Sequence, residues 1–248
     1  MSNIAGKLRD SLSRRGVLGT ARFLITAPFN LIIQRTPLQH RLREYKDWRF
    51  DRKHNVNTDG SIQLNALSID NPNRQHGQRY EAVPADVFHH MLGHLPEIEH
   101  EDLTFVDFGS GKGRALLLAS EYPFKQIVGV EFSFQLHKIA QGNIETYQSR
   151  TQKCKDLTSV CMDAVSFTLP SGNLLVFMAN PFNEPVMKRV LGNIEASVND
   201  QPRQIYIVYS NPQCGHLFDN AKFLTKLTHK GWFSIYQCTA PETVDHPA

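Results

Sequence analysis

The segment TFVDFGSGKGRALLLAS, residues 104–120, limits what this chain can fold into more than any other stretch. An apolar run ends at Asp107, and Gly109, Gly111 and Gly113 then alternate with other residues before a run of helix formers. Glycines allow a sharp turn and a close approach of the backbone to a ligand, and the first amide groups of a helix are free to bind it. The segment therefore predicts a strand, a ligand-binding turn and a helix.

From Tyr80 onward, strand patterns alternate with helix patterns, which is typical of a parallel sheet built from strand–helix units. The predicted strands cover residues 104–108, 126–131, 159–162, 174–179 and 204–209. The predicted helices cover residues 83–95, 114–121, 135–147 and 184–196. Alternating apolar and polar residues over 223–239, around Lys230 and Gly231, predict an antiparallel hairpin that closes the sheet.

The first part of the chain has a different composition. Residues 1–53 hold 12 Lys or Arg against 4 Asp or Glu, whereas the whole chain has a net charge of only +3. Apolar residues at helical spacing over 1–27 predict a basic amphipathic helix or helix pair, and the polar stretch 55–78 is typical of a loop. We therefore predict a basic helical extension and loop over 1–78 and a single domain over 79–248. The charge of residues 1–53 favours docking on an anionic surface, a membrane or a nucleic acid, and a solvated extension packed on the core is the alternative.

Several classes of protein do not fit the sequence. The four cysteines are scattered, with no CxxC pair and no secretory leader, so we expect reduced thiols in the cytoplasm. The most apolar stretch, residues 17–33, is interrupted by charge and proline, so we expect no transmembrane segment. His90 and His94 lie one helical turn apart without a third metal ligand, so we expect no metal site.

An acidic residue ends the second predicted strand. Glu131 lies at the end of IVGVE, twenty positions beyond Gly111, about the distance at which nucleotide-binding α/β folds place a carboxylate on ribose hydroxyls. An ordinary solvated acid at a strand end is the alternative. The order of Asp107, glycine turn and Glu131 favours the ribose role.

A further acidic residue, Asp163, ends the third predicted strand in SVCMDAVSF. This strand would bring Asp163 beside the base of a bound nucleoside. Its carboxylate would face the exocyclic amine of adenine, and the amide of Ala164 would face a ring nitrogen. Phe132 and Met162 would lie on the two faces of the ring. A helix N-cap at Asp163 is the alternative.

Other glycine-rich loops have different spacings. A phosphate-binding GxxxxGK[ST] loop would need Gly and Ser or Thr where Val106 and Gly113 stand, so the sequence excludes it. A dinucleotide-binding loop would place its third glycine where Arg114 stands, and a dinucleotide has no cation for Asp107. This alternative stays open, as does a turn that binds no ligand, in which the acidic strand ends would be coincidental.

Taken together, these motifs resemble those of class I methyltransferases that use S-adenosylmethionine. Motif I is DFGSGKG, the acidic motif is VGVEFS, and the later motifs are MDA and ANPF. The resemblance covers about residues 79–248 and implies an α/β Rossmann-like fold, with a seven-stranded mostly parallel sheet and an antiparallel C-terminal hairpin. It implies S-adenosylmethionine as cofactor, bound across the strand ends by Asp107, Gly109, Ser110, Gly111, Gly113, Glu131, Phe132, Asp163 and Ala164.

The fourth predicted strand runs into LLVFMANPFNEP, in which Asn180, Pro181 and Phe182 resemble the Asn/Asp-Pro-Pro-aromatic motif of methyltransferases that modify amino nitrogens. Phe182 stands where that motif has its second proline. The resemblance implies that the Asn180 side-chain oxygen and the next backbone carbonyl accept hydrogen bonds from the target amine. An Asn-Pro turn without a catalytic role is the alternative.

Upstream of motif I, GQRYEAVPADVFHHML at residues 77–92 resembles the tyrosine-containing segment of non-SET protein lysine methyltransferases, which covers the cofactor. Tyr80 and Glu81 are the matching residues, and a tyrosine packed against the sheet is the alternative. With FDRKHNVNTDG at 50–60, the segment also resembles a bacterial group of methyltransferases without an assigned substrate.

The resemblance implies a methyltransferase that acts on nitrogen, with protein lysine favoured over nucleic acid or a small molecule as acceptor. The alternative from another class is a non-catalytic cofactor-binding module that docks on nucleic acid or membrane through its basic N-terminus. Acids at all three strand ends favour cofactor binding in both cases. Lys112 and Arg114, next to the glycine turn, are expected to be solvated residues at a helix start.

Overall fold

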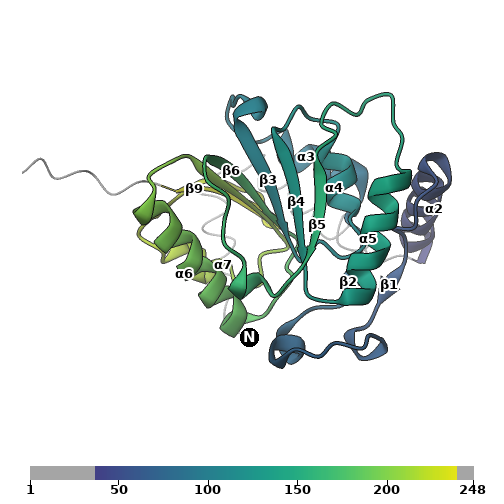
Figure 1. The fold of residues 1–248 in the computed structure, drawn as a ribbon, viewed down its shortest axis with the longest axis horizontal. Helices are drawn as coiled ribbons and strands as arrows, with labels where there is room; N and C mark the ends of the chain where they lie inside the picture. The colour runs from purple at the N-terminus through teal and green to yellow at the C-terminus, as the bar shows by residue number, and fades with distance from the viewer. Residues whose placement is uncertain (1–36, 239–248) are drawn as a thin grey trace, which may run out of the picture. The chain divides into compact units, whose positions relative to one another are not determined.

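Seven strands form one sheet in the larger of two units of this chain (Figure 1). The computed structural model describes residues 37–238, and the two units divide between Lys46 and Asp47. The predicted helix or helix pair over residues 1–27 lies outside the described residues. Helix α2 spans Pro37–His54, so its last turns, from Asp47 onward, belong to the larger unit.

The order of the strands defines the fold. In chain order the strands are β3 Leu103–Phe108, β4 Gln126–Glu131, β5 Leu157–Cys161, β6 Asn173–Met178, β7 Ile205–Ser210, β8 Leu224–His229 and β9 Phe233–Cys238. They are arranged β5-β4-β3-β6-β7-β9-β8 across the sheet. All neighbours are parallel except β9, which runs antiparallel to both β7 and β8. This arrangement confirms the predicted Rossmann-like α/β fold, including the hairpin at its end.

Helices cover both faces of the sheet. They are α3 Ala85–Leu92, α4 Arg114–Ala119, α5 Phe134–Thr146, α6 Glu184–Asp200 and α7 Gly215–Asp219. α6 and α7 pack on one face, α3 and α4 pack on the other, and α5 lies against β4 and β5 (Figure 1). Successive residues of a strand point to opposite faces, so Val106 and Phe108 of β3 join the core under α6, whereas Phe105 joins the core under α3.

The polar stretch 55–78 is more ordered than the predicted loop. It contains the short strand β1 Ser61–Ile62 and two 3-10 helices, η1 Leu64–Ala66 and η2 Pro72–His76. Strand β1 pairs antiparallel with β2 Tyr80–Glu81, which follows the stretch. Residues 47–78, which composition assigns to an extension, fall within the larger unit. The predicted helix over 83–95 is shorter, Ala85–Leu92, because Pro84 precedes it and Gly93 follows it.

Two findings concern membranes and metals. Across residues 37–238, no helix is both long and apolar enough to cross a lipid bilayer. Within the same part of the chain, no three His, Cys, Asp or Glu side chains come together so as to hold a metal ion. His90 contacts His94, with ring centres 4.6 Å apart, and also stacks on Trp232 at 5.7 Å.

Candidate functional site

The glycine turn joins β3 to α4 in a conformation that glycine adopts most readily. Gly109, Gly111 and Gly113 all have positive φ, at 78°, 56° and 85°. Space is a second constraint, because a Cβ atom at Gly109 would overlap the Pro181 side chain and one at Gly111 would overlap the ring of Tyr80. Two side chains of the protein itself therefore make the close approach that the first two glycines allow.

Two buried carboxylates lie beside this turn, at the carboxyl ends of β3 and β4. Glu131 accepts hydrogen bonds from the amides of Gly111, at 2.9 Å, and Ser133, at 2.8 Å. Asp107 is 3% exposed, and no described residue donates a hydrogen bond to its carboxylate. Burial raises the pKa of Glu131 to about 7, and burial together with the neighbouring Glu131 raises the pKa of Asp107 to about 8. The site thus holds a buried acid that lacks a cationic partner among the described residues.

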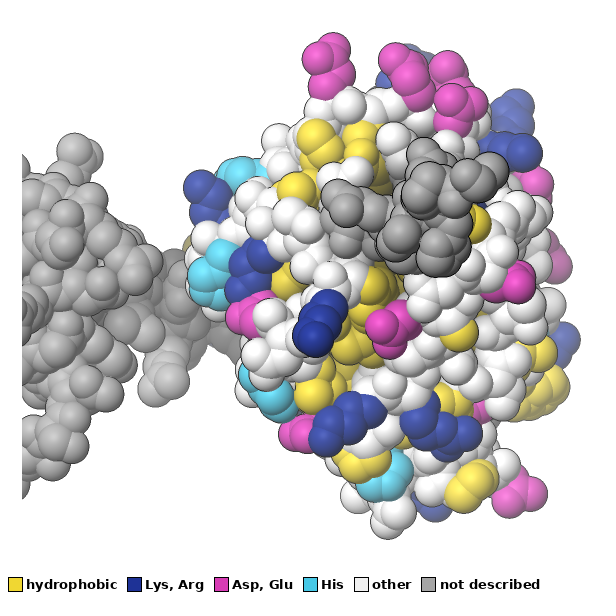
Figure 2. All heavy atoms as spheres, turned by 90° about the vertical axis from the view of Figure 1, so that its left-hand side faces the viewer, with side chains coloured by type: hydrophobic (Ala, Val, Ile, Leu, Met, Phe, Trp, Pro, Cys, Tyr) yellow, Lys and Arg dark blue, Asp and Glu magenta, His cyan; other side chains and the backbone are white. Residues whose placement is uncertain are grey.

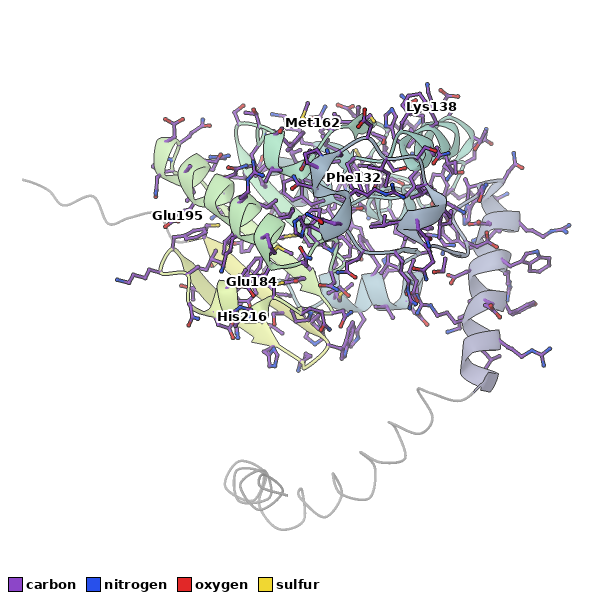
Figure 3. All side chains as sticks on the ribbon, turned by 90° about the horizontal axis from the view of Figure 1, so that it is seen from below. Phe132, Lys138, Met162, Glu184, Glu195 and His216 are labelled. Atoms are coloured by element: carbon purple, nitrogen blue, oxygen red, sulfur yellow. The ribbon has the colours of Figure 1, made fainter. Side chains whose placement is uncertain are left out.

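A cavity opens at this end of the sheet, near the junction of β3 and β6 where the strand order reverses. Its empty volume is about 890 Å³, including the mouth that is open to solvent. Met162, labelled with Phe132 in Figure 3, lines it. Of the predicted site residues, only Gly113 lies outside the wall; those that line it are Tyr80, Asp107, Gly109, Ser110, Gly111, Glu131, Phe132, Asp163, Ala164, Asn180, Pro181 and Phe182.

Residues 71–82, called the strap here, run along the cavity and pair with the loop after β6. The Gln78 amide donates to the Pro181 carbonyl at 3.0 Å, and the Asn183 amide donates to the His76 carbonyl at 2.8 Å. Local sequence patterns do not reveal this pairing, because the two segments lie about a hundred positions apart. The strap and the loop therefore form one connected wall.

Asp163 has three hydrogen-bond donors inside the protein. Its Oδ1 accepts from the Val165 amide at 3.0 Å, which makes Asp163 the N-cap of the 3-10 helix η4, Ala164–Ser166. Its Oδ2 accepts from the side-chain amides of Asn71 and Asn73 in the strap, at 3.0 Å and 2.7 Å. The N-cap role is therefore present, and a contact of Asp163 with adenine stays a prediction.

The Asn-Pro-Phe motif lies where β6 ends. Asn180 has a φ of 50°, in the left-handed region, and its Oδ1 accepts a hydrogen bond from the Tyr209 hydroxyl at 3.3 Å. The Pro181 carbonyl accepts from Gln78. The resemblance assigns Asn180 Oδ1 and the Pro181 carbonyl oxygen to a target amine. Each accepts one hydrogen bond within the protein and keeps a second lone pair.

Tyr80 packs on the glycine turn and also lines the cavity, and its role in covering a cofactor stays a prediction. Its ring packs on Gly111 and lines the cavity, and its hydroxyl donates to the carbonyl of Thr58. Burial raises the pKa of the phenol far above its ordinary value, so the hydroxyl keeps its proton. Tyr80 is therefore held against the turn from the far side by the segment around Thr58.

Lys112 and Arg114 are buried, so the expectation of solvated helix-start residues is wrong. The Arg114 guanidinium pairs with Asp47 at 3.1 Å and with Asp51 at 3.2 Å. Lys112 Nζ donates to the carbonyl of Asp59 at 2.8 Å. A buried cation needs such partners. The motif FDRKHNVNTDG contains two of them, Asp51 and Asp59, and was the sequence feature that could have indicated buried partners for Lys112 and Arg114.

Several solved structures that resemble this chain are methyltransferases. A ribosomal protein L11 methylase from Lactobacillus delbrueckii subsp. bulgaricus is 12% identical, with a TM-score of 0.43 over 63% of this chain and 76% of its own. An RNA methyltransferase from Salinibacter ruber, in complex with S-adenosyl-L-homocysteine, is 18% identical, with a TM-score of 0.43 over 66% and 97%. A predicted N6-adenine-specific DNA methylase from Listeria monocytogenes is 13% identical, with a TM-score of 0.46 over 64% and 52%. No family model and no curated protein matches the chain, and the fold follows from the order and directions of the strands.

Proposed function

We propose that this chain binds S-adenosylmethionine in the cavity near the junction of β3 and β6 and transfers its methyl group to an acceptor. The observation that carries the proposal is the buried Asp107 carboxylate, which lines the cavity beside the glycine turn and has no hydrogen-bond donor among the described residues. A cationic amino group is the partner that such a carboxylate lacks. S-adenosylmethionine carries that group, together with a ribose and an adenine.

Other residues of the cavity fit the rest of this molecule. Glu131 accepts one backbone amide at each oxygen, so each oxygen keeps a lone pair for a ribose hydroxyl. Ser110 Oγ is buried without a hydrogen-bond partner among the described residues and is free to pair with a ligand. Phe132 and Met162 supply apolar surface for an adenine ring.

The cofactor supplies a methyl group on a positively charged sulfur, and transfer breaks one C–S bond as it forms one bond to the acceptor. The work of this chain is to align the acceptor and to exclude water. The strap and the loop after β6 contribute one wall to that site, joined by the hydrogen bonds of Gln78 with Pro181 and of Asn183 with His76.

For the acceptor, we propose a nitrogen, with protein lysine ahead of nucleic acid or a small molecule. Asn180 and Pro181 line the cavity at the end of β6 and keep oxygen lone pairs for an amine. A lysine, whose ordinary pKa is about 10.4, must be neutral when it attacks, and burial in the cavity favours the neutral form. On the face shown in Figure 2, the described Lys and Arg side chains are mixed with Asp, Glu and His, unlike the basic surface typical of nucleic-acid binding.

Calorimetry of the full chain with S-adenosylmethionine, S-adenosylhomocysteine and NAD tests the cofactor. We expect the first two to bind and NAD not to bind, and tight binding of NAD alone would overturn the proposal.

A second experiment identifies the acceptor. The full chain and methyl-tritiated S-adenosylmethionine are added to fractions of a lysate from cells that lack the gene. Label that a protease releases supports a protein acceptor, and label that a nuclease releases supports the nucleic-acid alternative.

A further inference from the structure

Tyr209, at the end of β7, contacts Asn180 from outside the wall of the cavity. Its side chain is fully buried, and its ring packs on Phe218 with the ring centres 5.0 Å apart. The hydroxyl accepts a hydrogen bond from the Cys214 amide at 3.2 Å and donates one to Asn180 Oδ1 at 3.3 Å. The Cys214 amide can only donate, and the Cys214 sulfur, which also contacts the hydroxyl, is a weak acceptor, so Asn180 Oδ1 is the stronger acceptor for the proton of the Tyr209 hydroxyl.

This hydrogen bond determines which way the side-chain amide of Asn180 faces. An asparagine amide has an oxygen on one side and an NH2 group on the other, so a 180° flip exchanges an acceptor for donors. The backbone has little freedom of its own, because Asn180 has a φ of 50° and precedes Pro181. Without the hydroxyl of Tyr209, the amide would be free to present either group to the cavity.

We propose that Tyr209 is a positioning residue for the acceptor site, which holds the Asn180 amide in one of its two flipped orientations. The inference rests on the proposed function, because it gives Tyr209 a role in methyl transfer, although Tyr209 touches neither acceptor nor cofactor. Burial raises the pKa of Tyr209 well above its ordinary value, so the phenol keeps the proton that it donates at any ordinary assay pH.

Two matched variants separate this role from a general effect on the core. Tyr209→Phe removes the hydroxyl and keeps the ring. Tyr236→Phe is the control, since Tyr236 is also buried, packs on the same Phe218 at 5.3 Å and donates one hydrogen bond, to Asp219 at 2.8 Å. Neither tyrosine lines the cavity. A general loss of core stability would therefore lower the transfer rate in both variants, whereas loss of the contact with Asn180 would lower it in Tyr209→Phe alone.

Three measurements are made on each variant of the full chain: the Kd of S-adenosylmethionine by calorimetry, the rate of label transfer to the lysate fraction, and the 15N NMR signal of the Asn180 side-chain NH2. The signal is assigned by its absence in Asn180→Ala. We expect Tyr209→Phe to keep the Kd within about twofold, to move the NMR signal, and to lower the rate about 3- to 10-fold, the scale of one neutral hydrogen bond. When Tyr209→Phe is added to Asn180→Ala, we expect no further loss of rate, because Tyr209 acts through Asn180.

Equal losses of rate in Tyr209→Phe and Tyr236→Phe, or an undiminished loss in the Asn180→Ala background, would overturn the inference and assign the effect to the core. An unchanged Asn180 amide signal in Tyr209→Phe would overturn it even before an acceptor is known. Failure of the wild type to bind S-adenosylmethionine is a different result, because it rejects the proposed function and with it any role in transfer. The NMR signal would then still report whether Tyr209 holds Asn180.

Discussion

Arg114 and Asp51 form a buried ion pair, with Nη2 and Oδ1 3.2 Å apart, that joins the first residue of α4 to the last turn of α2. The Thr58 hydroxyl donates to the same Asp51 carboxylate at 2.6 Å, and the Thr58 carbonyl accepts from Tyr80, whose ring covers Gly111. Hydrogen bonds therefore connect the glycine turn with a segment that composition alone assigns to an extension.

Deletion of residues 1–54 should destabilise the domain strongly, whereas deletion of residues 1–46 should not. The longer deletion removes Asp47 and Asp51 and leaves Arg114 buried without these partners, which costs about 3–5 kcal/mol. The shorter deletion keeps both aspartates, so its melting temperature and its Kd for S-adenosylmethionine should match those of the full chain. Equal melting temperatures for the two deletions would show that the ion pairs contribute little.

The shorter deletion also tests the basic segment. Residues 1–46 hold 9 Lys or Arg against 2 Asp or Glu, so the full chain should bind anionic vesicles or nucleic acid at low salt and release them as salt screens the charges. The chain from residue 47 onward should bind neither. Flotation and filter binding measure these associations, and identical behaviour of the two chains would argue against a docking role.

The stability of the unliganded domain should fall as pH rises. The folded-state pKa values of Asp107 and Glu131, about 8 and about 7, are raised above their ordinary values of 3.8 and 4.5. The stability that these groups contribute is therefore fully present below the ordinary values and is lost as pH rises through 7 to 8. We expect a higher melting temperature at pH 6 than at pH 8.5, and a smaller difference in Asp107→Asn. A melting temperature that rises over this range in the wild type would contradict the assigned pKa directions.

Glu131→Ala should weaken the binding of S-adenosylmethionine by about 1.5–3 kcal/mol, as expected for a lost hydrogen bond to a charged group. The same substitution leaves the amide of Gly111 without its acceptor, so part of the effect reflects a looser turn. Glu121→Ala is a suitable control, because Glu121 lies outside the cavity and pairs with His89. If Glu131→Ala binds as tightly as the control, the ribose role is wrong.

The fold could be predicted from sequence because its signals are local. Each buried strand is a short apolar run, and the predicted strands 104–108, 126–131, 159–162, 174–179 and 204–209 all begin and end within two residues of the observed ones. The glycine turn and Glu131 are local signals too. The cavity then follows, because parallel strands bring their carboxyl ends to one edge of the sheet.

The contacts that complete the site are not local, and no periodic pattern marks them. Asp51 and Arg114 are 63 positions apart, and Asn71 and Asp163 are 92 positions apart. The sequence also supplies a ligand-binding reason for Gly111, whereas the structure places the ring of Tyr80 against it. Contacts between segments that are distant in sequence, such as the strap and the loop after β6, can therefore be identified only from the structure.

Asn180→Ala should lower turnover by about 10²-fold or more, the scale of a lost positioning contact, while leaving the affinity for the cofactor nearly unchanged. Asn180 lines the cavity at the end of β6, and within residues 37–238 its side chain hydrogen-bonds Tyr209 alone, so neither Asp107 nor Glu131 depends on it. Alanine at its positive φ of 50° also costs roughly 1–2 kcal/mol of stability.

Asn211→Ala controls for that strain, because Asn211 has a φ of 49° and lies outside the cavity wall. Both variants should melt at lower temperatures, but only Asn180→Ala should lose turnover, and Asn180→Asp should keep part of it because it retains an acceptor oxygen. Label transfer to the identified acceptor measures these rates. Equal turnover by Asn180→Ala and wild type would leave Asn180 as a turn residue alone, and an O-methyl product would reject the nitrogen acceptor.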